Sequence, residues 1–493
     1  MSPVTPLEPW QTAWPALPAL LMVAWGVWGL RREIKLDRWG ALVLLLALLV
    51  RVVWVPLERH EFDGHEAEYR DLFLGTRALG RGGTLLYPAM QWLYAGLGIV
   101  LDDPRWLLVF STGISLLGIA ATMNAVRRLW APGPALAAGL LMAGWGDAVF
   151  WASSAYNVIL PHTLLAVGLW ALAALIDGAR PGAAGALAGG AFALAVATRV
   201  EGALVAPAAL ALVGLYRPPA PGRWAPGLVL GGLLGAVAMA LVLSAGEAPG
   251  ADARAASFWM NLGILAYFAP FDAPITWLAL AVGAAIAVVE RPKLAVPLLL
   301  LIPGLHLASA TFDDYGVRHL LNVGFGLGVA AGGLTARRWA WPLALLLIVP
   351  MMQDLGDLRR RYYASEETFA EALDPSLPRI DVAELPACAL IVEDFRVVPE
   401  DKQRSHFNLL DAAEAEGLRA EGGGCLWWLY GVQDHRLSSR AVRDRAIRTM
   451  LLYETKPVAV VIGPERGYVG LTMEIGNRRA LPLFPALAPV ESP

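Results

Sequence analysis

One short segment near the N-terminus concentrates the side chains that could carry chemistry. Residues 58–71 read ERHEFDGHEAEYRD and contain six carboxylates, two histidines and two arginines, in a chain in which only 16% of the residues are charged. A carboxylate in this segment could act as a general base that removes a proton from a hydroxyl group. The alternative is an ordinary solvated amphipathic helix over 65–80, with Leu72 and Phe73 against the membrane.

Polar residues from later parts of the chain are expected on the same side of the membrane. They are Asn157 and His162, the turn with Arg199 and Glu201, and Tyr315 with Arg318. An ionisable group costs about 2.5–3.5 kcal/mol or more at the bilayer centre, so such groups line a cavity or pair with one another. For Arg199 and Glu201, a structural ion pair at a tight turn is the alternative to a ligand role. Arg51 is expected to snorkel toward the outer end of its span.

The elements that must position these residues are membrane helices. The chain of 493 residues is 57% hydrophobic and has a mean hydropathy of +0.53. A helix needs about 20 apolar residues to cross a hydrocarbon core of roughly 30 Å, and apolar runs of about that length recur before residue 353. We therefore predict an α-helical polytopic membrane protein with about twelve transmembrane helices and a small C-terminal α/β soluble domain.

The distribution of Lys and Arg predicts the topology. The candidate spans are 13–30, 39–57, 106–126, 134–152, 160–176, 183–199, 203–216, 226–244, 274–289, 294–310, 319–335 and 339–352. Lys and Arg are enriched in cytoplasmic loops, and with these spans every basic cluster falls on one side. Counting Leu85–Leu101 as a span would reverse the later loops, so we predict that it lies along or dips into the outer interface. Three of its aromatic residues suit headgroup depth, namely Tyr87, Trp92 and Tyr94.

The return of charged residues after residue 352 divides the chain. The predicted regions are a transmembrane domain at 1–352, a connector at 353–386 and a periplasmic α/β domain at 387–493. The soluble domain alternates a strand at 387–393, a helix at 404–420, a strand at 425–430, a helix at 438–452, and strands at 457–463 and 467–474. Its two cysteines, Cys388 and Cys425, could form one disulfide outside the cytoplasm.

The residue pattern argues against two classes of function. The basic residues form no patch with interleaved aromatic residues, so no nucleic-acid partner is expected. A transporter should carry polar groups along a path through the midplane, with repeated halves and broken helices. Here the middles of the predicted spans are almost wholly Leu, Ala, Val and Gly, without an internal repeat. Polar groups gathered at one interface favour chemistry at the membrane surface.

Five short motifs resemble those of the C-type glycosyltransferases that use polyprenyl-phosphate sugars. This family includes protein mannosyltransferases, aminoarabinose transferases and rhizobial lipopolysaccharide sugar transferases. The motifs are Glu66-Ala-x-Tyr69, Tyr87-Pro88, Arg127-Arg-Leu-Trp130, Thr198-Arg-x-Glu-Gly202 and Tyr315-x-x-Arg318. Each motif is weak alone, and their order and spacing over roughly residues 39–352 carry the resemblance.

The resemblance implies an enzyme of the bacterial inner membrane that transfers a hexose or pentose with inversion. The donor would be a polyprenyl-phosphate-linked sugar, and the acceptor a hydroxyl group of an envelope lipid, glycan or protein on the periplasmic face. One alternative is a membrane glycan ligase or polymerase that uses the same kind of donor. Another is a transporter or a non-enzymatic membrane scaffold.

The resemblance also implies a catalytic base in the first loop. Relatives usually carry Asp-Glu-Ala-x-Tyr, whereas this chain has His65-Glu-Ala-Glu-Tyr69, with Asp63 two residues earlier. Asp63 is therefore the first candidate for the base, and Glu66 and His65 are the alternatives.

Other roles follow by analogy with the family. The candidates for the donor phosphate and lipid are Arg318, Tyr315, Arg199 and Tyr69. In the second outer loop, where relatives often carry another acid, Asn157 and His162 stand instead and are candidates for acceptor binding. No cofactor is certain, although a divalent metal could be held by Asp63, His65 and His162.

Overall fold

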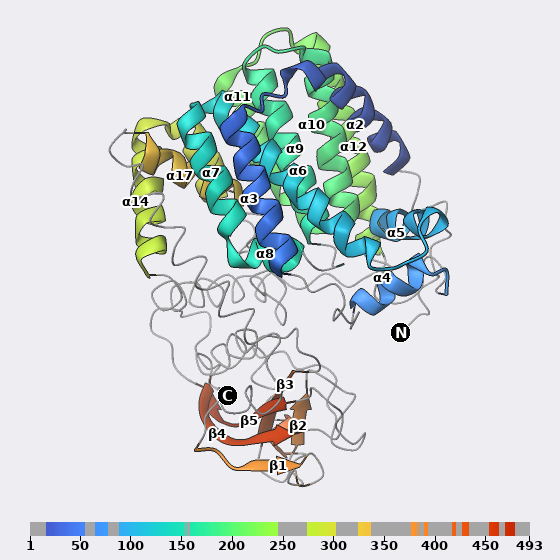
Figure 1. The fold of residues 1–493 in the computed structure, drawn as a ribbon, viewed down its shortest axis with the longest axis vertical. Coiled ribbons are helices and arrows are strands. Elements are labelled where there is room, and N and C mark those ends of the chain that lie inside the picture. Colours follow the sequence, from blue (N-terminus) through green and yellow to red (C-terminus); the bar gives the residue numbers. More distant parts are fainter. Residues whose placement is uncertain are drawn as a thin grey trace, which may run out of the picture. The chain divides into compact units, whose positions relative to one another are not determined.

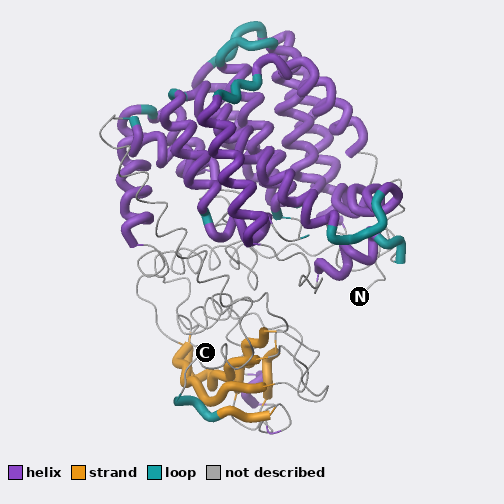
Figure 2. The backbone as a smooth tube through the Cα atoms, in the orientation of Figure 1, coloured by secondary structure: helices purple, strands orange, loops and turns teal. Residues whose placement is uncertain are grey.

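The computed structural model describes residues 16–54, 65–76, 88–152, 155, 158–244, 274–301, 324–336, 376–381, 384, 389–392, 417–420, 426–432, 453–462 and 469–478. The chain divides into two compact units, one built from helices and the other around a small β-sheet (Figures 1 and 2). The described part is therefore mostly helical, with several apolar helices and a C-terminal sheet, as predicted.

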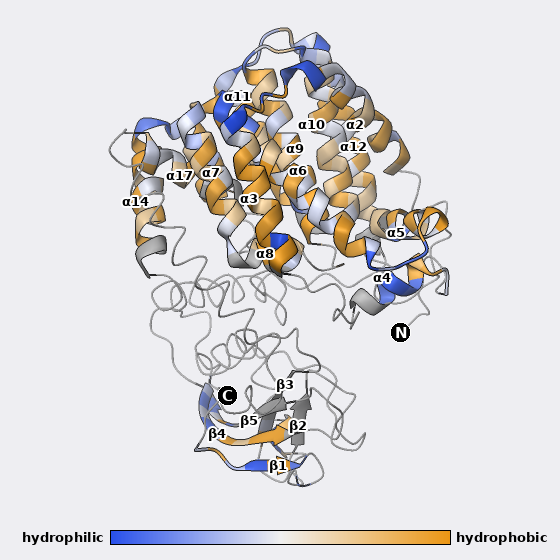
Figure 3. Cartoon of the chain, in the orientation of Figure 1, coloured by the Kyte–Doolittle hydropathy of each residue, from blue (hydrophilic) through white to orange (hydrophobic). Residues whose placement is uncertain are grey.

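The helical unit is built from helical segments, most of which are mainly apolar (Figure 3). In chain order they are α2 (Ala16–Leu30), η1 (Arg31–Glu33), α3 (Arg38–Trp54), α4 (His65–Phe73), α5 (Pro88–Val100), α6 (Trp106–Leu129), α7 (Pro132–Gly144), α8 (Gly146–Ala152), α9 (Ile159–Ile176), α10 (Pro181–Thr198), η4 (Val200–Val205), α11 (Ala206–Tyr216), α12 (Pro221–Ser244), α14 (Pro274–Glu290), α15 (Pro292–Val296), the π-helix η5 (Pro297–Leu301) and α17 (Gly324–Thr335). Each predicted span within the described residues overlaps one of these segments, and the last predicted span, 339–352, lies outside them.

Several of these helices can cross a bilayer. Among the described residues, four are long and apolar enough by length and composition, namely α6, α9, α10 and the part Pro221–Leu241 of α12. Shorter apolar helices accompany them. The chain is a multi-pass membrane protein, and the number of its spans stays a prediction.

One predicted span is interrupted. We predict a single helix at 134–152, but α7 ends at Gly144 and α8 begins at Gly146, because Trp145 adopts an extended conformation with φ −67° and ψ 114°. The break leaves the last carbonyl groups of α7 without intrahelical partners. One of them, that of Ala143, accepts a hydrogen bond from the side chain of Arg51.

Small residues bring α10 close to its neighbours. α10 is rich in Ala and Gly and is buried along nearly its whole length. A Cβ atom at Gly231 would overlap the backbone of Gly189, so α12 and α10 touch backbone to backbone, and Gly26 of α2 lies against Leu187. Helices in lipid gain little from the hydrophobic effect when they associate, so close contact of this kind stabilises the bundle.

Ion pairs join three loops that carry basic residues. Arg127 at the end of α6 binds Asp37 with an N–O distance of 2.6 Å. Its neighbour Arg128 binds Glu33 at 2.8 Å and Asp177 at 2.7 Å. The three loops therefore lie at one end of the helical unit, where hydrophilic residues gather in Figure 3. We call this the basic end and the opposite one the outer end.

The same ion pairs indicate whether α5 spans the membrane. α5 covers most of the segment that is predicted to lie at the outer interface. α3 begins beside Asp37 and α6 ends beside Arg127, so the chain leaves the basic end and returns to it between these residues. Between Asp37 and Arg127 the chain must therefore cross the bundle an even number of times. α3 and α6 supply two crossings, and α5 as a third would make the number odd. α5 has 13 residues, about 20 Å of helix, which is less than the roughly 30 Å of the hydrocarbon core. This supports the prediction that α5 does not span.

The second unit holds a five-stranded mixed sheet with the order β1-β4-β5-β3-β2. Its strands are β1 (Arg379–Asp381), β2 (Ala389–Val392), β3 (Leu426–Val432), β4 (Tyr453–Ile462) and β5 (Val469–Arg478). β5 pairs antiparallel with β4 and β3, whereas the edge strands β1 and β2 pair in parallel with β4 and β3, respectively.

Most of the predicted strands correspond to observed ones. The strands predicted at 387–393, 425–430, 457–463 and 467–474 correspond to β2, β3, β4 and β5. β1, with three residues, is too short for its alternation to be recognised in the sequence. Residues 417–420 of the predicted helix 404–420 are helical. The rest of that helix, the helix predicted at 438–452 and both cysteines lie outside the described residues.

Replacement of Gly231 by Ala is expected to destabilise the helical unit by roughly 1–3 kcal/mol, the usual cost of overpacking, because the added methyl group meets the backbone of Gly189. Gly232 is the matched control, since a Cβ atom there has no neighbour within 4 Å. Gly232→Ala should be neutral or slightly stabilising through helix propensity. Thermal unfolding in detergent measures the difference, and equal midpoints for the two variants would contradict direct contact between α10 and α12.

The stability of the basic end is expected to depend on pH through Asp37. Its pKa is lowered from 3.8, first by a hydrogen bond from the backbone N–H of Gly40 and then by Arg127. A lowered pKa in the folded state means that the carboxylate stabilises the fold above 3.8 and that this contribution is lost as the pH falls through the folded-state pKa. Asp37→Asn should therefore lower the thermal midpoint near neutral pH and have little effect in acid. A difference in thermal midpoint between the wild type and Asp37→Asn that stays constant with pH would contradict a stabilising role of the Asp37 charge.

Candidate functional site

The structure describes some of the predicted site residues, and those that it describes lie at the outer end. Side chains are described for Tyr69, His162 and Arg199, whereas for His65 and Glu66 only the backbone of α4 is described. The predicted residues outside the described part are Asp63, Asn157, Tyr315 and Arg318. The roles inferred for them from the sequence stay predictions.

α4 buries its apolar residues inside the protein. Tyr69, Leu72 and Phe73 are 1%, 2% and 3% exposed, and they share a cluster with Met90 and Tyr94 of α5. The prediction that Leu72 and Phe73 face the membrane is therefore wrong. A sequence shows that a residue is apolar, but not whether lipid or protein covers it. These residues anchor α4 to α5.

α4 also has a polar face. The guanidinium group of Arg70 binds the carboxylate of Asp71 at 2.9 Å, and both side chains are more than a third exposed. With one side packed on protein and another open to solvent, α4 has the arrangement that a helix needs to present carboxylates to a ligand.

α5 joins three segments of the outer end. The ring of Tyr94 packs edge-on against Tyr69 of α4, with ring centroids 5.0 Å apart. Its hydroxyl group donates a hydrogen bond of 2.9 Å to the carbonyl oxygen of Ala155, in the second predicted outer loop. At the start of α5, Ala89 packs against the cluster that contains Val196 of α10. One short helix thus connects the first outer loop, the second outer loop and the end of α10.

The aromatic residues of this segment do not behave alike. Trp92 is 38% exposed, as expected at headgroup depth, whereas Tyr94 is 1% exposed and hydrogen-bonded inside the protein. Tyr94 therefore faces protein rather than lipid, its predicted depth stays a prediction, and Tyr87 lies outside the described residues. The role of Tyr94 depends on Ala155, which is far away in sequence, so residue type and spacing could not reveal it.

The close approach of α4 and α5 depends on Gly98. A Cβ atom at this position would overlap the carbonyl oxygen of Phe73. The last turn of α4 therefore rests on the backbone of α5. Gly98 positions α4 without being a candidate for chemistry, and its only signal in the sequence is a glycine inside an apolar helix.

Arg199 is a buried cation at the outer end of α10. It is 6% exposed and has an extended backbone with φ −162° and ψ 122°. Its N–H donates to the carbonyl oxygen of Ala195, and its carbonyl oxygen accepts from Gly202, so the chain turns sharply into η4. The side chain of Glu201 lies outside the described part, so the ion pair and the ligand role both stay open for Arg199.

His162 lies in the first turn of α9 and is 4% exposed. The next residue, Thr163, donates a hydrogen bond of 2.9 Å to the carbonyl oxygen of Ile114 and ties α9 to α6. Within the described residues, no group of three His, Cys, Asp or Glu side chains could hold a metal ion. The other predicted metal ligands, Asp63 and the imidazole of His65, lie outside that part.

Arg51 is buried rather than snorkelling, so the prediction for it is wrong. Its side chain is 1% exposed. Nε donates to Ser115 of α6 at 3.1 Å, and Nη1 donates to the carbonyl oxygens of Ala47 in α3 at 3.1 Å and Ala143 in α7 at 3.4 Å. One guanidinium group therefore fastens three helices beneath the outer end. The acceptor in α7 is free because that helix ends at Gly144.

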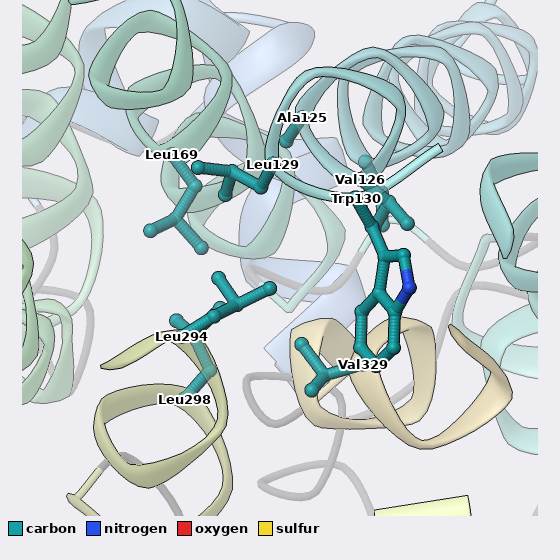
Figure 4. A pocket seen from close by; sticks show the side chains of 9 residues that line it. Ala125, Val126, Leu129, Trp130, Leu169, Leu294, Leu298 and Val329 are labelled. Atoms are coloured by element: carbon teal, nitrogen blue, oxygen red, sulfur yellow. The ribbon is translucent and has the colours of Figure 1, made fainter. Parts of the chain in front are cut away.

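A small pocket between α6, α9, α15, η5 and α17 offers no polar group for chemistry (Figure 4). It is lined by Thr122, Ala125, Val126, Leu129, Trp130, Leu169, Leu294, Leu298 and Val329. The hydroxyl group of Thr122 donates to the carbonyl oxygen of Gly118 inside α6. Trp130 follows α6 at the basic end, so the pocket is separate from the candidate site.

Comparisons with known proteins find similar solved structures but no sequence relative. The sequence matches no family model and no curated protein. The structure is similar to the oligosaccharyltransferase of Archaeoglobus fulgidus in complex with Zn and sulfate, with a TM-score of 0.43 and 11% identity over 86% of this chain and 72% of that one. It is also similar to ArnT from Cupriavidus metallidurans in the apo state, with a TM-score of 0.46 and 15% identity over 92% and 99% of the two chains.

Both proteins are C-type membrane glycosyltransferases, the family that the sequence motifs resemble. Similarity at these TM-scores and identities is one of general arrangement, and it assigns no role to any residue of this chain.

Replacement of Gly98 by Ala is expected to displace α4 from α5, because the added methyl group meets the carbonyl oxygen of Phe73. Gly96→Ala is the matched control on the same helix, since its Cβ atom has no neighbour within 4 Å. Overpacking costs about 1–3 kcal/mol, so hydrogen exchange of the α4 amides should accelerate roughly tenfold or more in Gly98→Ala alone. Equal protection of α4 in both variants would show that the two helices are not in contact there.

Proposed function

We propose that this protein is a membrane glycosyltransferase. It transfers a sugar from a polyprenyl-phosphate-linked donor to a hydroxyl group of an envelope lipid, glycan or protein. The reaction takes place at the outer end, on the periplasmic face in the predicted topology, and it inverts the anomeric configuration.

The observation that carries the proposal is the gathering of separate segments around α5. Tyr94 of α5 packs its ring against Tyr69 of α4, the helix that begins at His65, and donates its hydroxyl hydrogen bond to Ala155 of the second outer loop. The end of α10, where Arg199 is buried, contacts the start of α5. Acidic residues from one segment and a cation from another are thus drawn to one end of an apolar bundle. Sugar transfer from a lipid phosphate requires both kinds of group.

The proposed reaction uses these groups in one displacement. A carboxylate, assigned to Asp63 with Glu66 and His65 as alternatives, takes the proton of the acceptor hydroxyl group. The hydroxyl oxygen bonds to the anomeric carbon from the face opposite the phosphate, and the bond from that carbon to the phosphate oxygen breaks. The lipid phosphate leaves with the bonding electron pair. Attack from the opposite face inverts the configuration.

Cations stabilise the negative charge that develops on the leaving phosphate. Arginine suits this task because its planar fork binds phosphate oxygens in pairs. The residues assigned to the donor phosphate and lipid are Arg318, Tyr315, Arg199 and Tyr69. The residues assigned to the acceptor side are Asn157 and His162. The prenyl chain would lie along the apolar helices, with its head at the outer end.

A divalent metal would add positive charge beside the phosphate. The ligands proposed for it are Asp63, His65 and His162. Of these, only the side chain of His162 is described, and it is buried in the first turn of α9. No step of the proposed transfer requires the metal.

The proposal is tested with purified protein, candidate polyprenyl-phosphate sugars and a hydroxyl acceptor. Asp63→Asn is expected to lower turnover about 10²–10⁴-fold, the usual contribution of a general base, and Glu66→Gln should have the smaller effect. Asp71→Asn is the matched control on α4, because this exposed carboxylate is bound to Arg70. It should keep wild-type turnover. Turnover that survives in both Asp63→Asn and Glu66→Gln would remove the assignment of the base.

A further inference from the structure

Two neighbouring loops at the basic end carry arginines that sugar transfer does not use. One loop precedes α10 and the other precedes α12. A Cβ atom at Gly178 in the first would lie 3.8 Å from Pro219 in the second, so the loops are adjacent. The indole N–H of Trp224 donates a hydrogen bond of 3.1 Å to the carbonyl oxygen of Pro219 and fixes the second loop on α12. We call the cations of these loops and of the first turn of α12 the arginine patch: Arg180, Arg217 and Arg223.

Two members of the arginine patch have a left-handed backbone. φ is 39° at Arg180, directly before α10, and 50° at Arg217, directly after α11. Glycine or asparagine usually occupies such positions, because a Cβ atom is disfavoured there. The same conformation occurs at Ala220, with φ 56°, so the two loops are tight turns that hold Arg180 and Arg217 at the ends of their helices.

The arginine patch lacks counter-ions among the residues that the structure describes. The three guanidinium groups are exposed and make no ion pair or side-chain hydrogen bond within that part of the chain. The nearest acid in sequence, Asp177, is bound to Arg128 at 2.7 Å. In the described ranges, the other acids at the basic end are Glu33 and Asp37, which bind Arg128 and Arg127, and the exposed Glu290, which adjoins Arg291. Positive charge is therefore in excess on this surface.

The arginine patch lies where apolar helices leave the hydrocarbon. α10 begins one residue after Arg180, and α11 ends one residue before Arg217. At the same end, Trp28 is 66% exposed, and the guanidinium carbon of Arg31 lies 3.7 Å from the centroid of its ring. Exposed indole rings beside arginines are typical of the headgroup region of a bilayer.

We propose that the arginine patch binds the phosphate groups of anionic phospholipids in the adjacent leaflet, which is the cytoplasmic one under the positive-inside rule. Guanidinium groups without counter-ions, held at headgroup depth, match the phosphate oxygens in geometry and charge. The cytoplasmic leaflet carries a negative surface potential that favours this binding. This lipid site is at the opposite end from the candidate site, and it does not depend on sugar transfer.

The test compares phosphatidylglycerol with phosphatidylcholine of identical acyl chains, bound to the full chain in detergent and measured by native mass spectrometry. The wild type is expected to retain phosphatidylglycerol preferentially. Each of Arg180→Gln, Arg217→Gln and Arg223→Gln should lower this affinity about fivefold, and the triple variant roughly a hundredfold, with phosphatidylcholine unaffected. Arg105→Gln is the control, because it removes one exposed cation before α6, at the outer end. It should bind phosphatidylglycerol like the wild type.

A second pair of variants separates charge from backbone strain. Arg180→Gly with Arg217→Gly removes both the cations and the disfavoured φ angles. It should raise the thermal midpoint in phosphatidylcholine and remove most of the additional stabilisation by phosphatidylglycerol, because only Arg223 of the arginine patch remains. Lysine at the three positions keeps the charge and should retain phosphatidylglycerol within about fivefold of the wild type. Equal affinity of the wild type and the triple Gln variant for phosphatidylglycerol would overturn the proposal, and so would an equal loss in Arg105→Gln.

Discussion

Backbone contact around α10 is the constraint on which the helical unit depends. In a membrane, an apolar side chain gains little by exchanging lipid for another helix, so the closeness of approach decides which helices associate. The Ala and Gly residues of α10 let α2, α9 and α12 lie against it. With these neighbours in place, both ends of α10 have defined positions. Arg199 is held at one end, and the loop with Arg180 is held at the other.

Both ends of the bundle hold charged side chains, and each end buries some of them. At the basic end, carboxylates are neutralised by Arg127 and Arg128, and other arginines remain exposed to the headgroup region. At the outer end, ionisable side chains such as Arg51, His162 and Arg199 are buried. Burial strengthens electrostatic interactions because it excludes water.

The predictable part of the fold follows from properties that extend over many residues. The length of apolar runs predicts the helices, and the asymmetry of Lys and Arg predicts which loops meet and that α5 does not span. What the sequence does not reveal depends on contacts between distant segments. Tyr94 is buried because Ala155 offers a carbonyl oxygen, and Arg51 is buried because α7 ends where it does. β1 is too short to be predicted from its own residues, and it is defined by its pairing with β4.

The candidate site shows the same limit. The density of carboxylates in the first loop marks it as unusual, and the predicted topology assigns it to the outer side. Neither property indicates that α4 rests on α5 through Phe73 and Gly98. Such a contact depends on how two short helices cross, and no periodicity within either helix encodes that.

The position of α5 has a thermodynamic consequence. Tyr94 contacts Tyr69 on one side and Ala155 on the other, while Ala89 reaches the end of α10. A ligand that shifts α4 therefore changes the free energy of the second loop and of the α10 terminus through the same helix. Occupancy at one loop and conformation at the other become linked equilibria, and the linkage is reciprocal.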